Sequence, residues 1–166
     1  MNLYLIPSLL AADTQHLLPV PYLQETLQGV SHYLVENERS ARRFLSSLPL
    51  GKEIRPLELF RLDKKTTEAQ VAAIFGTIPK GSSVGILSEA GAPCIADPGS
   101  KAVAYAHQKG WNVCPLPGPT SIALALMGSG FNGQTFTFHG YLPIDGGSGA
   151  KKVKQLERQM RSDGGT

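Results

Sequence analysis

The chain has 166 residues, of which 42% are hydrophobic and 17% charged, a balance typical of a folded globular protein rather than a disordered chain. Sixteen basic and 13 acidic side chains leave a formal charge of only +3, which is low for a surface that tracks nucleic-acid phosphates. No apolar run reaches the roughly 18 residues that cross a membrane. The two cysteines, Cys94 and Cys114, lack metal-type spacing, so we expect reduced thiols in a cytoplasmic protein.

Short apolar runs alternate with amphipathic segments up to about residue 127. The apolar runs predict buried strands at 2–6, 31–35, 55–59, 83–87 and 111–114. The amphipathic segments predict helices at 20–28, 38–47, 100–109 and 119–127, with a further helix capped by Thr66 or Thr67. This alternation is typical of an α/β fold, in which helices cover both faces of a parallel sheet. Such sheets bind ligands beyond the carboxyl ends of their strands.

The character of the sequence changes after residue 127. An aromatic run at 135–142 predicts a strand, and a basic helix is expected at 150–161. A lone strand cannot bury its face or pair its edges. We therefore expect an N-terminal α/β domain at 1–116 and the beginning of a C-terminal α/β domain at 117–166, which is either truncated or completed by a partner chain.

The segment SEAGAP, residues 88–93, follows a predicted strand. Its small side chains let the backbone approach a ligand, Gly91 permits a positive φ, and Glu89 supplies a carboxylate. Asp97 is expected to cap the next helix, with Pro98 at the first helical position. The segment matches no phosphate-binding pattern, and its acid suits a net-cationic ligand such as S-adenosylmethionine (SAM). A tight strand-to-helix connection explains the same pattern equally well.

A second loop, PLPGPTS at 115–121, also follows a strand and opens a helix. Free N–H groups there, with the hydroxyls of Thr120 and Ser121, can bind a polar ligand atom, although capping explains both residues as well. We expect the two loops to leave adjacent strands and so to converge on one ligand. The sequence holds no serine-hydrolase elbow, nucleophile–base pair or histidine metal spacing, so no metal is expected. Methyl transfer needs none of these, because positioning supplies much of the barrier reduction.

Three stretches have the order and spacing of a known family: VGILSEAGAPCIADPG (84–99), VCPLPGPTS (113–121) and FTFHGYLP (136–143). In these stretches the chain resembles the tetrapyrrole methylase superfamily, and most closely its branch of bacterial small-subunit ribosomal-RNA 2′-O-methyltransferases. The resemblance implies two α/β domains, a SAM site in the cleft between them, and a homodimer. It implies SAM contacts from Pro7, Ser88, Glu89, Ala90, Gly91, Ala92, Pro93, Thr120, Ser121 and Ile122, with others in the second domain.

The chain departs from that branch at positions which face the acceptor in the family. PSLLA at 7–11 replaces P-I-G-N-L, and ENER at 36–39 keeps only Glu36 and Arg39 of E-D-T-R. Glu89 stands where aspartate is usual. The resemblance thus makes Glu36 and Arg39 candidates for the acceptor side of the site and assigns no catalytic base.

These observations predict a SAM-dependent methyltransferase that acts on RNA, such as ribosomal-RNA ribose, or on a small molecule, without a membrane partner. Methylation of a tetrapyrrole or a protein, and a non-catalytic module that binds SAM for regulation, are the alternatives. An unrelated nucleotide-binding α/β domain is a third interpretation. The three arginines within 39–43 favour RNA, whereas the modest net charge and the altered N-terminal motif weaken it. Solvated helix faces also explain the basic groups, including those at 151–154.

Overall fold

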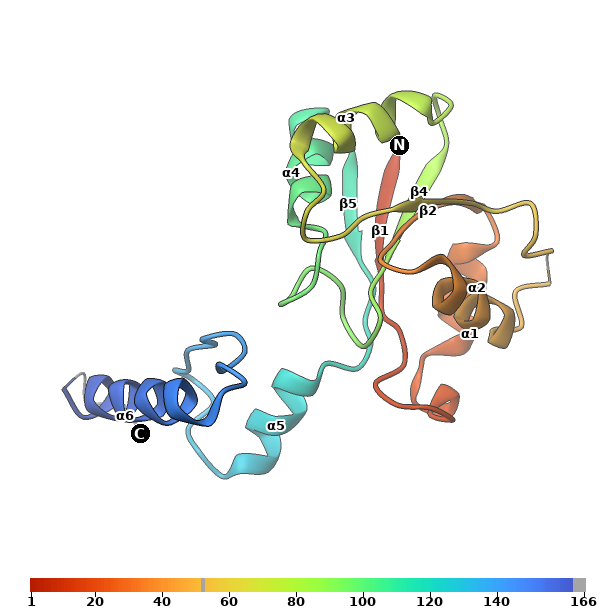
Figure 1. The fold of residues 1–166 in the computed structure, drawn as a ribbon. Coiled ribbons are helices and arrows are strands. Elements are labelled where there is room, and N and C mark those ends of the chain that lie inside the picture. Colours follow the sequence, from red (N-terminus) through yellow and green to blue (C-terminus); the bar gives the residue numbers. More distant parts are fainter. Residues whose placement is uncertain (52, 163–166) are drawn as a thin grey trace. The chain divides into compact units, whose positions relative to one another are not determined.

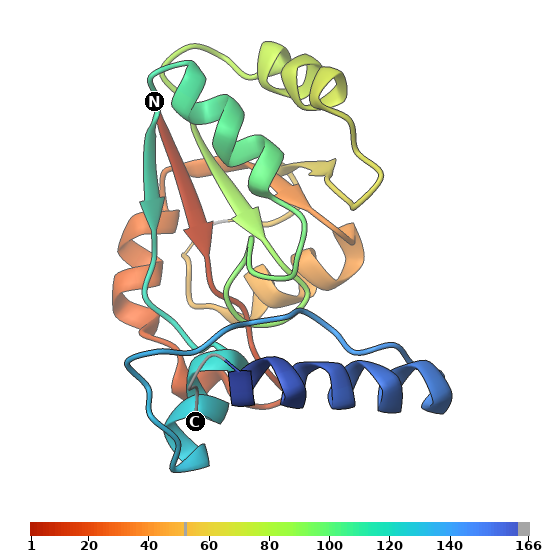
Figure 2. The same cartoon turned by 90° about the vertical axis from the view of Figure 1, so that its left-hand side faces the viewer.

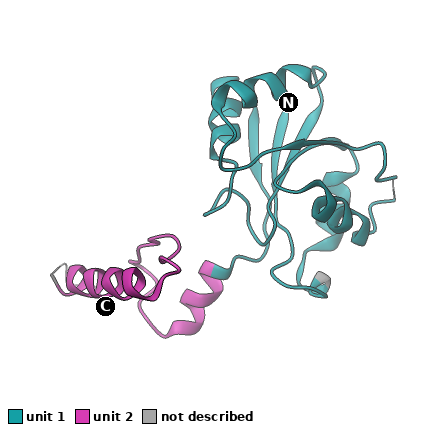
Figure 3. Ribbon diagram, viewed as in Figure 1, with its two compact units in different colours: residues 1–121 teal, residues 122–166 magenta. Residues whose placement is uncertain are grey.

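A computed structural model describes residues 1–51 and 53–162 (Figure 1). The chain divides into two compact units, residues 1–121 and residues 122–166 (Figure 3). The first unit contains the whole sheet. The second contains most of one helix and all of another.

The sheet of the first unit has five strands, and all of its neighbouring strands are parallel. They are β1 (Asn2–Ile6), β2 (Val30–Val35), β3 (Glu58–Arg61), β4 (Ser83–Leu87) and β5 (Asn112–Pro115). Their order across the sheet is β3-β2-β4-β1-β5. Because the strands are parallel, their carboxyl ends meet at one edge, which confirms the predicted α/β sheet and fixes where its loops gather.

Four α-helices and one 3₁₀ turn connect these strands. They are η1 (Gln15–Leu17), α1 (Val20–Leu27), α2 (Glu38–Ser47), α3 (Glu68–Thr77) and α4 (Ser100–Gln108). The side chain of Asn37 caps α2 by accepting a hydrogen bond from the Arg39 N–H at 2.9 Å. Thr67 and Gln70 form a reciprocal capping box on α3, which confirms the predicted cap.

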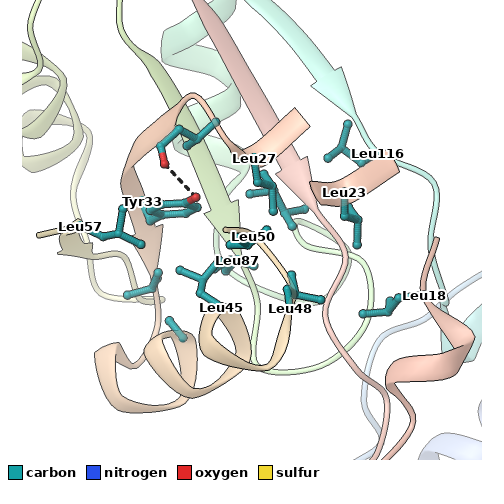
Figure 4. Close-up of a cluster of buried hydrophobic side chains, with 14 residues drawn as sticks. Leu18, Leu23, Leu27, Tyr33, Leu45, Leu48, Leu50, Leu57, Leu87 and Leu116 are labelled. Carbon is teal, nitrogen blue, oxygen red and sulfur yellow. Dashed lines mark hydrogen bonds between the residues drawn. The ribbon is translucent and has the colours of Figure 1, made fainter. Parts of the chain in front are cut away.

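Helices cover both faces of the sheet (Figures 1 and 2). Side chains alternate between the faces along each strand: Tyr33 and Val35 of β2 pack with α1 and α2, whereas Leu34 packs with α3 and α4. Tyr33 is fully buried, and its hydroxyl donates to the Val30 carbonyl at 3.0 Å (Figure 4). Burial raises the pKa of this phenol. Side chains therefore fill the space between the sheet and the helices on both faces. A ligand is expected to bind at an edge of the sheet.

The segment before β3 is held by Arg42 of α2. Its guanidinium donates to the carbonyl oxygens of Ile54 at 2.8 Å and Leu57 at 3.1 Å. Strand β3 consequently starts at Glu58, not at the predicted residue 55, because these carbonyls bind an arginine rather than a neighbouring strand. Arg42, one of the three arginines expected to favour RNA, has a structural role here.

We predict that Arg42→Ala lowers the free energy of unfolding by about 1–3 kcal/mol, because the substitution leaves carbonyls without a charged donor. Urea unfolding followed by circular dichroism measures this change. Arg39→Ala is the matched control: Arg39 lies on the same helix with an exposed side chain, so its loss should change stability by less than about 0.5 kcal/mol. Equal changes for the two variants would contradict the structural role of Arg42.

The second unit consists of most of α5 (Ser121–Ser129), the segment after it, and α6 (Gly146–Ser162). The strand predicted at 135–142 is wrong, since these residues form no regular element. Its aromatic side chains are exposed, and within the described chain no strand lies beside them to complete a ladder. Among the described helices, none has both the length and the apolar character of a bilayer span.

Candidate functional site

The loops after β1, β4 and β5 meet at the carboxyl edge of the sheet. The Gly91 carbonyl accepts hydrogen bonds from the Ser8 N–H at 2.9 Å and the Ser88 hydroxyl at 3.1 Å. The Leu116 N–H donates to the Leu5 carbonyl at 2.9 Å, which ties the third segment to β1 as well. The expectation that β4 and β5 are adjacent is wrong, because β1 lies between them. The two predicted loops therefore converge through the end of β1.

Two glycines make this convergence possible. Gly91 has a φ of +69°, and a Cβ on it would lie 2.8 Å from Leu10 Cδ2 and 3.2 Å from the Pro119 carbonyl oxygen. A Cβ on Gly118 would overlap the ring of Pro7. A side chain at Gly118 would thus overlap a rigid ring, and one at Gly91 would be strained by the positive φ and crowd the Pro119 carbonyl. Both points lie in stretches that the sequence singled out.

The predicted cofactor-binding residues fall into two groups by exposure. Those that are buried and shape the loops are Pro7, Ser88, Gly91 and Pro93. Those with exposed or half-exposed side chains, able to touch a ligand, are Glu89, Ala90, Ala92, Thr120 and Ser121. The last predicted residue, Ile122, is the first of the second unit.

Three carboxylates at this edge influence one another. Desolvation raises the pKa of Glu36, and the negative charges of Asp97 and Glu89 raise it further. Desolvation also raises the pKa of Asp97, which Lys64 partly offsets. The Ser40 hydroxyl donates to Glu89 Oε1 at 2.6 Å and so fixes one carboxylate to α2. The edge therefore holds excess negative charge, which favours a cationic ligand.

Asp97 and Ser40 are the residues that the sequence did not reveal as part of this group. Asp97 was expected to cap α4, and that expectation is wrong: the cap position is Gly99, with a φ of +142° and no side-chain cap bond. The helix begins at Ser100, beyond the reach of an N-cap role for Asp97. For Ser40 the sequence carried no signal, since only the tertiary fold brings α2 to the loop after β4.

We predict that Glu89→Gln lowers the pKa of both Glu36 and Asp97, because the charge of Glu89 raises each of them. The raised pKa means that the folded state binds more protons than the unfolded state as these groups titrate. Their contribution to stability therefore grows as pH falls through the folded pKa. Carboxyl-carbon NMR titration measures the pKa values directly. Glu38→Gln, on the same helix as Ser40, is the control and should leave them unchanged; unaltered values in Glu89→Gln would refute the coupling.

A cavity of about 360 Å³ opens beside this acidic group. It is lined by residues 8–13 after β1, by Ser40, Arg43 and Phe44 of α2, and by residues 87–90 after β4. Its volume lies in the range of small-molecule sites. The cavity lining includes residues 8–11 of the altered N-terminal motif, together with Ser40 of α2, which follows the altered motif at 36–39 directly. It also places a cation and an aromatic ring beside the Glu89 loop.

The acceptor-side candidates differ in their surroundings. Glu36 follows β2 directly and is half-buried, with a pKa raised as described above. Arg39 lies in the first turn of α2 with an exposed side chain. Among the described residues, no His, Cys, Asp and Glu side chains form a group of three or more that could hold a metal ion.

The chain is similar over most of its length to proteins named ribosomal RNA small subunit methyltransferase I. It is 32% identical to the protein of that name from Vibrio cholerae over 80% of this chain and 44% of that protein. It is 30% identical to the protein of that name from Thermotoga maritima over 82% of this chain and 59% of that protein. It is 28% identical to the one from Escherichia coli O157:H7 over 97% of this chain and 54% of that protein. No protein-family model matches the chain. The chain spans about half the length of these relatives, and the matches confirm the predicted relationship.

Proposed function

We propose that this chain, a homologue over most of its length of the proteins named ribosomal RNA small subunit methyltransferase I, binds SAM and directs its methyl group to RNA. The observation that carries the proposal is the close packing of Pro7, Gly91 and Gly118 around the end of β1, beside a group of carboxylates. Sheets of this class bind ligands at that edge.

The chemistry of this edge fits SAM. Its sulfonium and ammonium groups suit a cluster of Glu36, Glu89 and Asp97 that Lys64 only partly offsets. Small side chains on the exposed part of the 88–93 loop allow a ligand to lie against the backbone. The Thr120 and Ser121 hydroxyls, at the end of the first unit, can hold a carboxylate or a ribose hydroxyl.

SAM supplies a methyl group on a positively charged sulfur, which is a good leaving group. The residues of this chain then have to bind, orient and handle a proton. When a hydroxyl is methylated it loses its proton, and the raised pKa of Glu36 makes that carboxylate a stronger base than usual. We propose Glu36 as the acceptor of that proton and Arg39 as a contact for the acceptor molecule.

RNA is the favoured acceptor because the names of the relatives specify ribosomal RNA and because arginines flank the site. Arg43 lines the cavity and Arg39 is exposed on the same helix. RNA phosphates are bound through such guanidinium groups. A cytoplasmic location and a homodimer belong to the same proposal.

Incubation of the full chain with methyl-labelled SAM, against cellular RNA and against metabolite extracts, tests the proposal. Label in RNA is the expected result. If label appeared only in small molecules, the acceptor would be a tetrapyrrole-like or other small molecule and not RNA. SAM binding without any transfer would contradict catalysis and indicate the regulatory module instead.

We predict that Arg39→Ala reduces methyl transfer to RNA about tenfold or more, since a charged contact to phosphate contributes about 1.5–3 kcal/mol, while the affinity for SAM is unchanged. Transfer kinetics at varied RNA concentration, alongside calorimetric SAM titration, separate the two effects. Arg55→Ala is the control, because Arg55 is also exposed but lies in the segment before β3 and not on α2. A loss of SAM affinity equal to the loss of transfer would mean that Arg39 is structural.

A further inference from the structure

Helix α6 carries a row of cations on one face. At 3.6 residues per turn, positions spaced by three and four share a face. The basic side chains in this spacing, here called the α6 stripe, are Lys151, Lys154, Arg158 and Arg161. The apolar side chains of the helix fall on the opposite face at Val153, Leu156 and Met160. All four side chains of the stripe are exposed, as are Val153 and Met160 of the apolar face.

The net positive charge of the chain comes from this helix. Residues 146–162 contain five basic side chains and one acidic side chain, a net charge of +4, whereas the full chain carries +3. The other 149 residues together therefore have a net charge of −1. Such a concentration of charge is the footprint expected of a polyanion-binding element.

Most of the stripe is free to bind an anion. Arg161 donates to Glu157 Oε1 at 2.6 Å one turn away, which compensates one cation. For Lys151, Lys154 and Arg158 the described part of the chain provides no acidic partner. All three side chains are exposed. A row of about 10 residues along a helix spans about 15 Å, enough to follow several phosphates of one strand.

We propose that the α6 stripe binds the phosphate backbone of RNA without reading its bases. The choice of RNA among polyanions rests on the proposed function; the polyanion chemistry rests on the stripe alone. A lipid surface is less suited, because membrane-surface helices bury aromatic and large aliphatic side chains. The apolar face of α6 offers only three aliphatic side chains and no aromatic ring. The stripe would add affinity for RNA rather than select its sequence.

Fluorescence anisotropy with a labelled single-stranded RNA oligonucleotide, measured on the full chain over a series of salt concentrations, tests the stripe. The triple variant K151Q/K154Q/R158Q should bind more weakly. Its plot of log affinity against log salt should be shallower by about 2, because each lost phosphate contact on a single strand reduces the slope by about 0.7. Glutamine is a good helix former, and circular dichroism verifies that helix content is retained.

Two controls make the test specific. K152Q removes a cation about 100° away around the helix and should leave the slope unchanged. The triple variant K65Q/K80Q/K109Q removes the same charge from exposed positions of the first unit and should also leave it unchanged. Equal losses of RNA affinity in both triple variants would refute RNA binding by the α6 stripe.

A second assay separates the α6 stripe from the cofactor proposal. Calorimetric SAM titration of K151Q/K154Q/R158Q should match the wild type, since the stripe contacts RNA only. If the wild type did not bind SAM, the proposed function would be contradicted. The salt dependence of RNA binding would still test the α6 stripe. Stronger binding of the stripe to vesicles of phosphatidylserine and phosphatidylcholine than to RNA would overturn the proposal in favour of a membrane surface.

Discussion

Gly91→Val is expected to abolish SAM binding while the sheet remains folded. Gly91 has a φ of +69°, a conformation that L-residues rarely adopt. Its Cβ would meet Leu10 Cδ2 at 2.8 Å and the Pro119 carbonyl at 3.2 Å, and the two further methyl groups of valine need still more space. The loop after β4 would have to withdraw from the ends of β1 and β5. Isothermal titration calorimetry measures the affinity, and circular dichroism measures the fold.

Gly110→Val is the matched control for this experiment. Gly110 has the same φ of +69°, but a Cβ there would meet nothing within 4 Å. The two variants share the backbone strain, about 1–2 kcal/mol, and only the first has the steric conflict. Gly110→Val should lose stability and keep its affinity for SAM. Retained SAM binding in Gly91→Val would contradict the placement of the cofactor at this loop.

Gly118→Ala is expected to have the second largest effect, a loss of SAM affinity of about fivefold to 100-fold. A Cβ on Gly118 would overlap the Cβ and Cγ atoms of Pro7. A proline ring has no flexible end that can move aside, so one of the two backbone segments must shift. Overpacking of this kind costs about 1–3 kcal/mol, and about 1.4 kcal/mol corresponds to a tenfold change in affinity. Titration calorimetry and thermal unfolding measure the two consequences.

Gly29→Ala provides the comparison for Gly118→Ala. An added Cβ at Gly29 would meet nothing within 4 Å, and the residue has no positive φ. The substitution should leave both stability and SAM affinity within about 0.5 kcal/mol of the wild type. If Gly118→Ala behaved in the same way, the contact between Pro7 and the 117–119 segment would have no part in cofactor binding.

The local structure could be predicted well where the signal lies within a few residues. A cap at Thr66 or Thr67 was predicted from two threonines before an apolar stripe, and Thr67 forms it, together with Gln70. The strand at 83–87 follows from an uninterrupted apolar run before a small-residue loop. β3 was misplaced because Arg42, which lies more than ten residues earlier, holds the preceding carbonyls. A pattern search cannot see such a tertiary contact.

The candidate site shows the same limit. The glycines at 91 and 118 stand out by residue type, because only glycine permits such a close approach. The order of the strands could not be predicted, because no local sequence pattern indicates that β1 lies between β4 and β5. Nor could the sequence place Ser40 beside Glu89, because the two residues come from different elements. The strand predicted at 135–142 failed because strand formation requires a partner strand, which an aromatic run cannot supply.

Calorimetric titration of the full chain with SAM tests the central proposal most directly. The predicted result is saturable binding that weakens as pH falls through the raised pKa values of Glu36 and Asp97, because protonation removes the negative charge that attracts the cation. NAD and ATP, titrated in parallel, should not bind. Binding of either nucleotide, together with no binding of SAM at any pH at which the protein is folded, would contradict it.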